Sequence, residues 1–114
     1  EAMLIRSNNP ATDALIRDLG GPAAVQTWLS WNGLSNIRVD RTIARLLADK
    51  RDLWDVRDSS TPNAMVQLLK KLDRGNVLST SSRHYLLGVM ARCQTGKNRM
   101  RGLLSPLTPV AHKT

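Results

Sequence analysis

Two short stretches near the ends of this chain carry side chains that could take part in chemistry. A hydroxyl and two amides, Ser7-Asn8-Asn9, stand near the beginning, and a lysine with a threonine, Lys113-Thr114, stands at the end. A hydroxyl both donates and accepts hydrogen bonds, and an amide can orient a carbonyl group. Taken alone, the first run is typical of a helix cap and the second of a basic strand end.

A third candidate is the charged loop, residues 38–62, which runs from Arg-Val-Asp-Arg to Arg-Asp-Ser-Ser-Thr-Pro. Its interior holds aspartates, basic residues and one short apolar triplet, Ile43, Leu46 and Leu47. A connection this long inside a compact domain is either disordered or a functional Ω-type loop closed at its neck. Arg41 and Asp58 could close that neck as a charge-assisted pair. The alternative is a solvated charged loop without closure.

The composition favours a single helical domain. The chain has 114 residues, of which 41% are hydrophobic and none is phenylalanine, so the core must be built from small and aliphatic side chains. Cys93 is the only cysteine, which excludes an internal disulfide and a cysteine-based zinc site. We expect it to be a buried, inert thiol, and no cofactor or metal is expected. No apolar run approaches the roughly 20 residues that span a bilayer.

The net charge of +8 is unevenly distributed, because all nine acidic residues lie before residue 74. Such asymmetry can indicate attraction for an anionic substrate or partner. The basic residues after position 73 lack interleaved aromatic residues and a recognised binding motif, so we do not expect nucleic-acid binding. The chain also opens inside a helical pattern, so we expect this start not to be a native N-terminus, and the missing signal peptide is uninformative.

Caps, glycines and apolar periodicity predict a series of short helices. Asn9-Pro10 and Thr61-Pro62 are typical of an N-cap followed by proline at the first helical position. Glycines end several of the patterns. The predicted helices cover 1–6, 10–19, 22–33, 62–74 and 82–93, with one or two helical turns at 97–104 and the start of a strand at 110–114.

The order and separation of these motifs resemble the helical domain of class A β-lactamases and related penicillin-recognising serine hydrolases, over essentially all 114 residues. The resemblance implies a mainly α fold. Residues 1–109 would form the helical domain, including an Ω-type loop at 38–62. Residues 110–114 would begin a strand of an α/β sheet domain whose remaining parts are not in this sequence.

The resemblance also implies roles for the terminal motifs. Ser7 would relay a proton to the leaving nitrogen of the substrate, and the Asn9 amide would hold the substrate's side-chain carbonyl. Asn8 departs from the family, which has an aspartate there that buttresses neighbouring backbone. Lys113 would assist the proton transfer and attract the substrate carboxylate, with Thr114 beside it.

Arg99 is a further substrate-binding candidate by the same resemblance. Some members of the family place an arginine on the short helix before this strand, where it reaches the carboxylate of penicillins and cephalosporins. A forked guanidinium suits a carboxylate better than a flexible ammonium. Arg101 is assigned to the surface, and His112 is expected to be a packing or strand-edge residue rather than a catalytic one.

Two features of the family are absent. No serine here is followed three residues later by a lysine, so the Ser-x-x-Lys nucleophile is not on this chain, and the chain alone should be inactive. In the charged loop, the family's water-activating glutamate and its asparagine partner correspond to Ile43 and Leu47. Asp49, Asp52 or Asp55 would have to replace the glutamate. Without a base for deacylation, an acyl-enzyme would persist.

Three functions therefore remain open. The first is a β-lactamase-like serine hydrolase, and the second is a penicillin-binding or peptidase-like acyl-enzyme with poor deacylation. The third is a basic helical binding module for an anionic partner. For the first two, the resemblance implies a β-lactam or peptidoglycan-like substrate, contacts with the remainder of the same polypeptide, a monomer when intact, and a periplasmic or secreted location.

Overall fold

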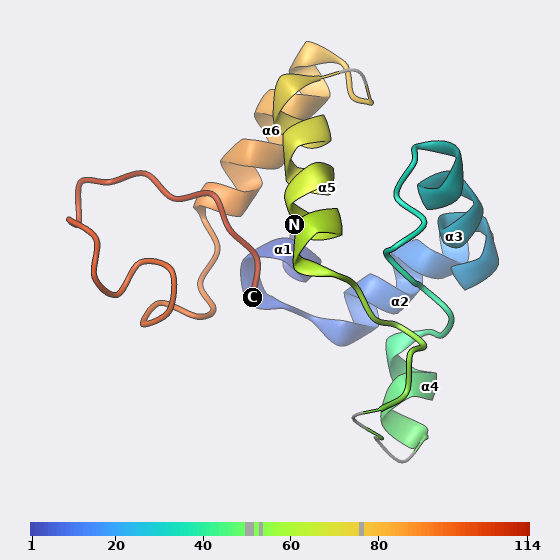
Figure 1. Cartoon of the computed structure of the whole chain (residues 1–114). Coiled ribbons are helices and arrows are strands. Elements are labelled where there is room, and N and C mark those ends of the chain that lie inside the picture. Colours follow the sequence, from blue (N-terminus) through green and yellow to red (C-terminus); the bar gives the residue numbers. More distant parts are fainter. Residues whose placement is uncertain (50–51, 53, 76) are drawn as a thin grey trace. The chain divides into compact units, whose positions relative to one another are not determined.

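The computed structural model describes residues 1–49, 52, 54–75 and 77–114. Within these residues the chain is helical, and its only pairing of extended backbone is an isolated antiparallel bridge between Ile37 and Ser60 (Figure 1). The helices are α1 (Ala2–Arg6), α2 (Asn9–Asp18), α3 (Pro22–Trp31), α4 (Ile43–Ala48), α5 (Pro62–Arg74) and α6 (Thr80–Ala91). The predicted mainly α fold is confirmed.

The first compact unit comprises residues 1–8 and 72–114. In this unit α1 packs against α6, and Val89, Met90 and Cys93 are buried. The expectation of a buried thiol is therefore confirmed. After α6 the chain makes a wide excursion without a further helix, and its last residues return to the end of α1 (Figure 1).

The second compact unit comprises residues 9–71. Here α2 packs against both α3 and α4. The core contains Leu29, Leu34, Ile37 and Ala64, which brings the end of α3, the segment after it and the start of α5 together. Gln26 reinforces this packing, because its amide donates to the Ile37 carbonyl at 3.2 Å and accepts from the Val39 N–H at 2.8 Å.

The charged loop contains a helix that the sequence reasoning missed. Helix α4 starts after Thr42, whose hydroxyl accepts from the Arg45 N–H at 3.2 Å as an N-cap. The apolar triplet Ile43, Leu46 and Leu47 has the i, i+3, i+4 spacing of one helical face. The sequence predicts no helix within residues 38–62, and the structure adds this short one. Residues 50, 51 and 53 of the loop lie outside the described part of the chain.

The segment after α6 also differs from expectation. Residues 97–104 form successive turns in which N–H groups bond three residues back, as in Arg99 N to Gly96 O at 3.0 Å. These are tight turns rather than a continuous α-helix. Residues 110–114 have no neighbouring strand within the described residues, so the strand predicted there stays a prediction.

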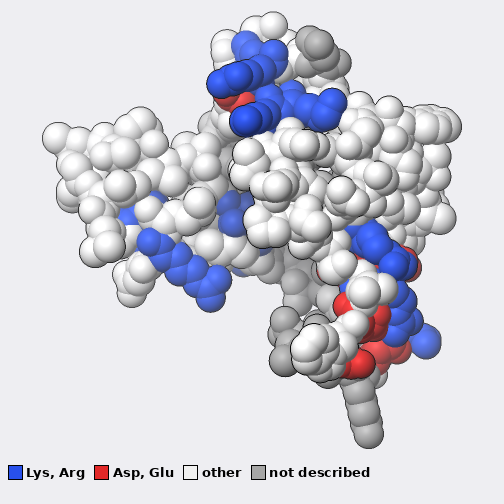
Figure 2. Space-filling view, viewed as in Figure 1, with Lys and Arg blue, Asp and Glu red and all other residues white. Residues whose placement is uncertain are grey.

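Charge is distributed differently in the two units. On the face shown in Figure 2, basic side chains on the segment after α6 have no acidic side chains beside them, whereas both signs mix around α4. No described helix is long and apolar enough to cross a bilayer. The mixed region around α4 is the charged loop, where acidic and basic groups pair with one another.

Candidate active site

Ser7 stands at an unusual point of the backbone. It follows the last residue of α1 with φ of 54° and ψ of 42°, in the left-handed region that serine seldom adopts. Among the described residues, the only other non-glycine residue with a positive φ is Asp58, also at 54°. Strained backbone of this kind collects at functional sites, where the surroundings enforce it.

The last two residues of the chain contact Ser7. The Lys113 ammonium donates to Ser7 Oγ at 2.8 Å, and Ser7 Oγ lies 3.3 Å from the Thr114 carbonyl oxygen, to which it can donate. Lys113 Nζ also contacts the Thr114 carbonyl. The cation can stabilise negative charge on the serine oxygen, and the carbonyl orients its proton. The structure thus brings Ser7, Lys113 and Thr114 together, although the lysine and the serine are 106 positions apart in the chain.

Thr114 is held from its other side by the turn at residues 95–96. Its hydroxyl donates to Thr95 Oγ1 at 2.5 Å. Gly96 has φ of 65°, and a Cβ built on it would collide with the Thr114 side chain. Only a glycine therefore permits this approach. Sequence reasoning did not identify Thr95, and no local signal marks it, because its partner is 19 residues away.

The other predicted substrate-binding residues are less closely packed. Arg99 is exposed on the turns after Gly96, and its guanidinium forms no ion pair with any described residue. Asn8 is exposed, and its backbone N–H lies 3.3 Å from the Ala2 carbonyl oxygen. Asn9 is the first residue of α2 in the second unit and is exposed. The substrate-binding roles of Arg99 and Asn9 stay predictions, as does the interpretation of Asn8 as a departure from the family's aspartate.

In the second unit, Arg41 and Asp58 come together at the neck of the charged loop. Arg41 Nε donates to Asp58 Oδ2 at 2.6 Å, and the Asp58 Oδ1 atom accepts from the backbone N–H groups of Asp40 and Arg41 at 2.7 and 3.0 Å. The Asp40 carboxylate in turn accepts from the Asp58 N–H at 2.9 Å. One carboxylate therefore holds both chain segments of the neck, with its arginine partner 17 positions away in the chain.

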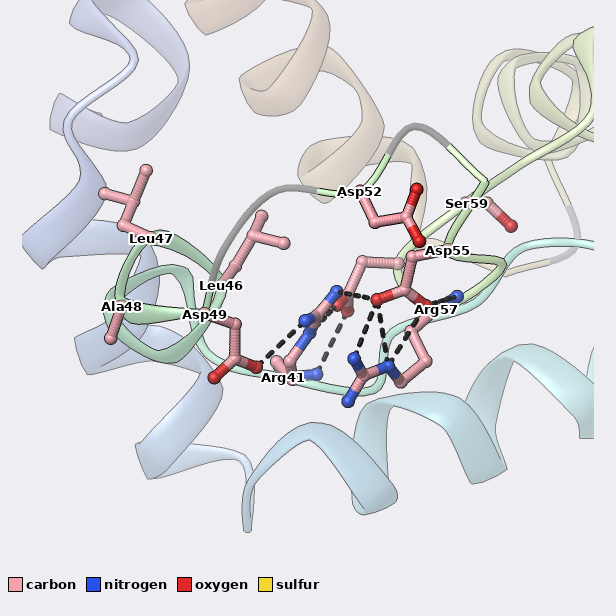
Figure 3. A pocket seen from close by; sticks show the side chains of 10 residues that line it. Arg41, Leu46, Leu47, Ala48, Asp49, Asp52, Asp55, Arg57 and Ser59 are labelled. Atoms are coloured by element: carbon pink, nitrogen blue, oxygen red, sulfur yellow. Dashed lines mark hydrogen bonds and ion pairs between the residues drawn. The ribbon is translucent and has the colours of Figure 1, made fainter.

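Arg41 binds two more carboxylates (Figure 3). Its Nη1 atom lies 2.9 Å from Asp49 Oδ2, and its Nη2 atom lies 3.3 Å from Asp55 Oδ2. Arg57 also chelates Asp55, at 2.7 Å and 3.0 Å from its two oxygens. The Arg57 hydrogen bonds hold the pKa of Asp55 well below its usual range, and the Arg41 hydrogen bond lowers the pKa of Asp49. Both aspartates are therefore poor proton acceptors.

These side chains line a hollow of about 550 Å³ in the charged loop (Figure 3). Its apolar lining comes from Leu46, Leu47 and Ala48, and its charged lining from the aspartates with Arg41 and Arg57. Asp52 also lines it and accepts from the Trp54 N–H at 2.9 Å. The described residues contain no cluster of histidine, cysteine and acidic side chains that could hold a metal ion.

From the contacts of Asp58 at the neck of the charged loop, we expect the free energy of unfolding to depend on pH. Burial raises the pKa of Asp58, but hydrogen bonds from Arg41 and from backbone N–H groups outweigh it, and the net shift is downward. A lowered pKa means that Asp58 contributes stability above its unfolded pKa of about 3.9 and loses it as the pH falls through the lower folded value. Asp58→Asn in the full-length protein should therefore cost about 1–3 kcal/mol of unfolding free energy at pH 7.

The difference between Asp58→Asn and the wild type should shrink below pH 4, measured by urea unfolding at several pH values. Asp18→Asn is the matched control, because the Asp18 carboxylate is exposed and lies 3.7 Å from its cationic neighbour, Arg17. A cost that is equal at pH 7 and pH 3 would show that the Asp58 charge does not stabilise the neck.

Comparison with known proteins assigns the family. A model of the β-lactamase enzyme family matches residues 1–114, the whole of the chain. The chain belongs to this family. Among curated relatives, the extended-spectrum β-lactamase PER-1 of Pseudomonas aeruginosa is 33% identical over 108 residues, which cover 95% of this chain and 34% of the relative. β-Lactamase L2 of Stenotrophomonas maltophilia is 34% identical over 113 residues, which cover 99% of this chain and 37% of that relative.

Solved β-lactamase structures share the fold. The crystal structure of the TLA-3 extended-spectrum β-lactamase superposes with a TM-score of 0.92 at 35% identity, covering 99% of this chain and 40% of that protein. The structure of a β-lactamase from Chitinophaga pinensis superposes with a TM-score of 0.93 at 31% identity, covering 99% of this chain and 41% of that protein. The chain therefore spans roughly a third of the length of the curated β-lactamases it matches, and its fold is that of their helical domain.

Ile43 and Leu47, the residues where the β-lactamase family pattern predicts a glutamate and an asparagine, lie on α4. Ile43 is the first residue of that helix, and Leu47 is 70% exposed. The N–H groups of Ile43 and Ala44 donate to the two carboxylate oxygens of Asp13 at 2.6 and 2.8 Å. Asp13 on α2 therefore fixes the start of α4, a role that sequence reasoning missed.

Proposed function

We propose that the intact protein is a β-lactamase-like serine hydrolase that is acylated by β-lactams and hydrolyses them slowly. The nucleophile would be a serine of a Ser-x-x-Lys motif outside this chain. The observation that supports this proposal best is the contact of Lys113 Nζ with Ser7 Oγ at 2.8 Å, since the two residues come from separate motifs of the family.

In this proposal Ser7 carries a proton to the leaving nitrogen of the β-lactam. Lys113 stabilises the serine oxygen while that proton moves and attracts the substrate carboxylate. Thr114 binds the same carboxylate when its hydroxyl proton turns from Thr95 Oγ1 to the substrate, and Asn9 holds the side-chain carbonyl of the substrate. Each assignment extends the family resemblance to a residue that this chain has at the matching position.

Arg99 is proposed to capture the substrate carboxylate. Arg99→Ala in the full-length protein should raise the substrate concentration at half-maximal acylation by about ten- to one-hundredfold, because a charge-assisted pair contributes about 1.5–3 kcal/mol. The melting temperature should stay within a degree or two, since the side chain is exposed. Arg101→Ala is the control. A large loss of stability in Arg99→Ala would instead make Arg99 a structural residue.

A second candidate function has specific support. A penicillin-binding or peptidase-like protein would form the acyl-enzyme and release it poorly. Ile43 has no proton-accepting group, and Asp49 and Asp55 are committed to Arg41 with lowered pKa values. Asp52 is the remaining loop aspartate that could act as a base, and it is exposed.

Mass spectrometry of the full-length protein after exposure to a penicillin separates these functions. A transient adduct together with turnover of a chromogenic cephalosporin supports the hydrolase. An adduct that persists for hours without turnover supports the acylating relative. No adduct, with no Ser-x-x-Lys upstream in the complete reading frame, would support the remote alternative of a basic binding module for an anionic partner.

The remaining polypeptide is the proposed partner of the exposed apolar side chains. Trp31 and Leu19 are 84% and 66% exposed on α3 and just after α2, and we propose that other parts of the intact protein cover such surfaces. We also propose a monomer that acts in the periplasm or outside the cell, as the family resemblance implies.

A further inference from the structure

His112 is the one buried polar or charged residue of the described chain, with 3% of its surface exposed. Its backbone N–H lies 3.3 Å from the Met90 carbonyl oxygen in the last turn of α6. Its ring Nε2 lies 3.1 Å from the Thr95 carbonyl oxygen, and its Nδ1 lies 3.3 Å from the Val110 carbonyl oxygen. His112 therefore connects the final segment to α6 and to the turn that follows it.

Thr95 is shared between His112 and the candidate active site. Its carbonyl oxygen faces the His112 ring, while its hydroxyl lies 2.5 Å from the Thr114 hydroxyl. The Thr114 carbonyl oxygen in turn lies 3.3 Å from Ser7 Oγ. Thr95 and Thr114 thus link the buried imidazole to the proposed proton relay, each through its backbone oxygen on one side and its hydroxyl on the other.

The chemistry of the imidazole favours a directed contact over simple packing. A carbonyl oxygen only accepts hydrogen bonds, so a ring nitrogen can bind one only when it carries a proton. The neutral ring has a single N–H, and the shorter of the two contacts, to Thr95, favours a proton on Nε2. An apolar side chain of similar size would leave the Thr95 carbonyl without this donor.

We propose that His112 is a positioning residue for the acylation step, because its Nε2–H holds the Thr95 carbonyl and thereby places Thr114 against the substrate carboxylate. This inference rests on the proposed function and deepens it. It replaces the sequence-based expectation of a packing residue with a specific hydrogen bond. Small displacements of a binding group by a residue remote from the chemistry can cost about a hundredfold in rate.

Two substitutions separate positioning from packing. In His112→Gln the side-chain amide can donate near the position of Nε2, whereas in His112→Asn the shorter amide reaches only the region of Nδ1. We expect His112→Gln to keep the wild-type acylation parameters within about threefold, and His112→Asn to raise the penicillin concentration at half-maximal acylation by about ten- to one-hundredfold. His84→Gln and His84→Asn are the matched controls, because His84 is exposed on α6.

Hydrogen exchange gives a second readout that needs no β-lactam chemistry. The amide of residue 112, which lies 3.3 Å from the Met90 carbonyl oxygen, should exchange about tenfold faster in His112→Asn and at the wild-type rate in His112→Gln. If Gln and Asn variants lose acylation and protection equally, or neither loses any, His112 is a packing residue and the inference is overturned. If the wild type forms no adduct at all, the proposed function fails, while exchange still decides whether His112 holds this segment through Nε2.

Discussion

Lys113→Ala in the full-length protein should slow acylation by a penicillin by about 10²–10⁴-fold, the range in which a positioned proton-transfer group contributes. The Lys113 ammonium lies 2.8 Å from Ser7 Oγ and donates to it directly. In the proposed relay, loss of this ammonium leaves the charge on the serine oxygen uncompensated while the proton moves. Rapid-quench mass spectrometry of the acyl-enzyme measures the effect.

Two further variants separate the role of the Lys113 ammonium from the general effect of losing one positive charge. Lys71→Ala removes an exposed lysine of α5 and should acylate at the wild-type rate. Lys113→Arg keeps the charge but replaces a compact ammonium by a wide planar group, so it should recover only part of the rate. If Lys113→Ala acylates as fast as Lys71→Ala, Lys113 takes no part in the proton relay.

The sequence predicts well those helices whose starts are marked by proline and whose ends are marked by glycine. Pro10, Pro22 and Pro62 each stand at or next to the first residue of their helix, and Gly20 and Gly75 follow helix ends with positive φ. These signals need only neighbouring residues. The sequence alone therefore places five helices, α1, α2, α3, α5 and α6.

Helix α4 was not predicted from the sequence, because the side chain that stabilises its start is remote in the chain. Its first N–H groups bind Asp13, which is 30 residues earlier in the chain, and six residues are too few to show a long apolar stripe. The local signals were the N-cap Thr42 and the triplet of Ile43, Leu46 and Leu47. When a helix is this short and its first N–H groups bind a remote side chain, local helix propensity is a weak predictor of it.

In the charged loop, too, one contact could be predicted from the sequence and others could not. The bracketing of the loop by Arg41 and Asp58 suggested a pair at its neck, and the structure places these two side chains 2.6 Å apart. The additional contacts of Arg41 with Asp49 and Asp55 could not be predicted, since they depend on how the loop folds. They change the chemistry, because they occupy two of the three aspartates that could have replaced the missing glutamate.

The largest gain of function should come from restoring that glutamate. Ile43→Glu places a carboxylate at the first position of α4, where the helix N-terminus favours negative charge. The Asp13 carboxylate binds the N–H of the same residue at 2.6 Å, and a neighbouring like charge raises the pKa of the new glutamate toward the range of a useful base. We expect the acyl-enzyme to be hydrolysed about 10²–10⁴-fold faster.

Ile43→Gln is the decisive control, because glutamine has the shape of glutamate but cannot accept the proton of a water molecule. The lifetime of the penicillin adduct should shorten in Ile43→Glu and remain that of the wild type in Ile43→Gln. The deacylation rate of Ile43→Glu should also rise with pH as the new carboxyl ionises, and the wild type should lack this step. Equal lifetimes in the two variants would mean that no hydrolytic water binds at residue 43, and that the proposed slow deacylation does not result from the missing glutamate.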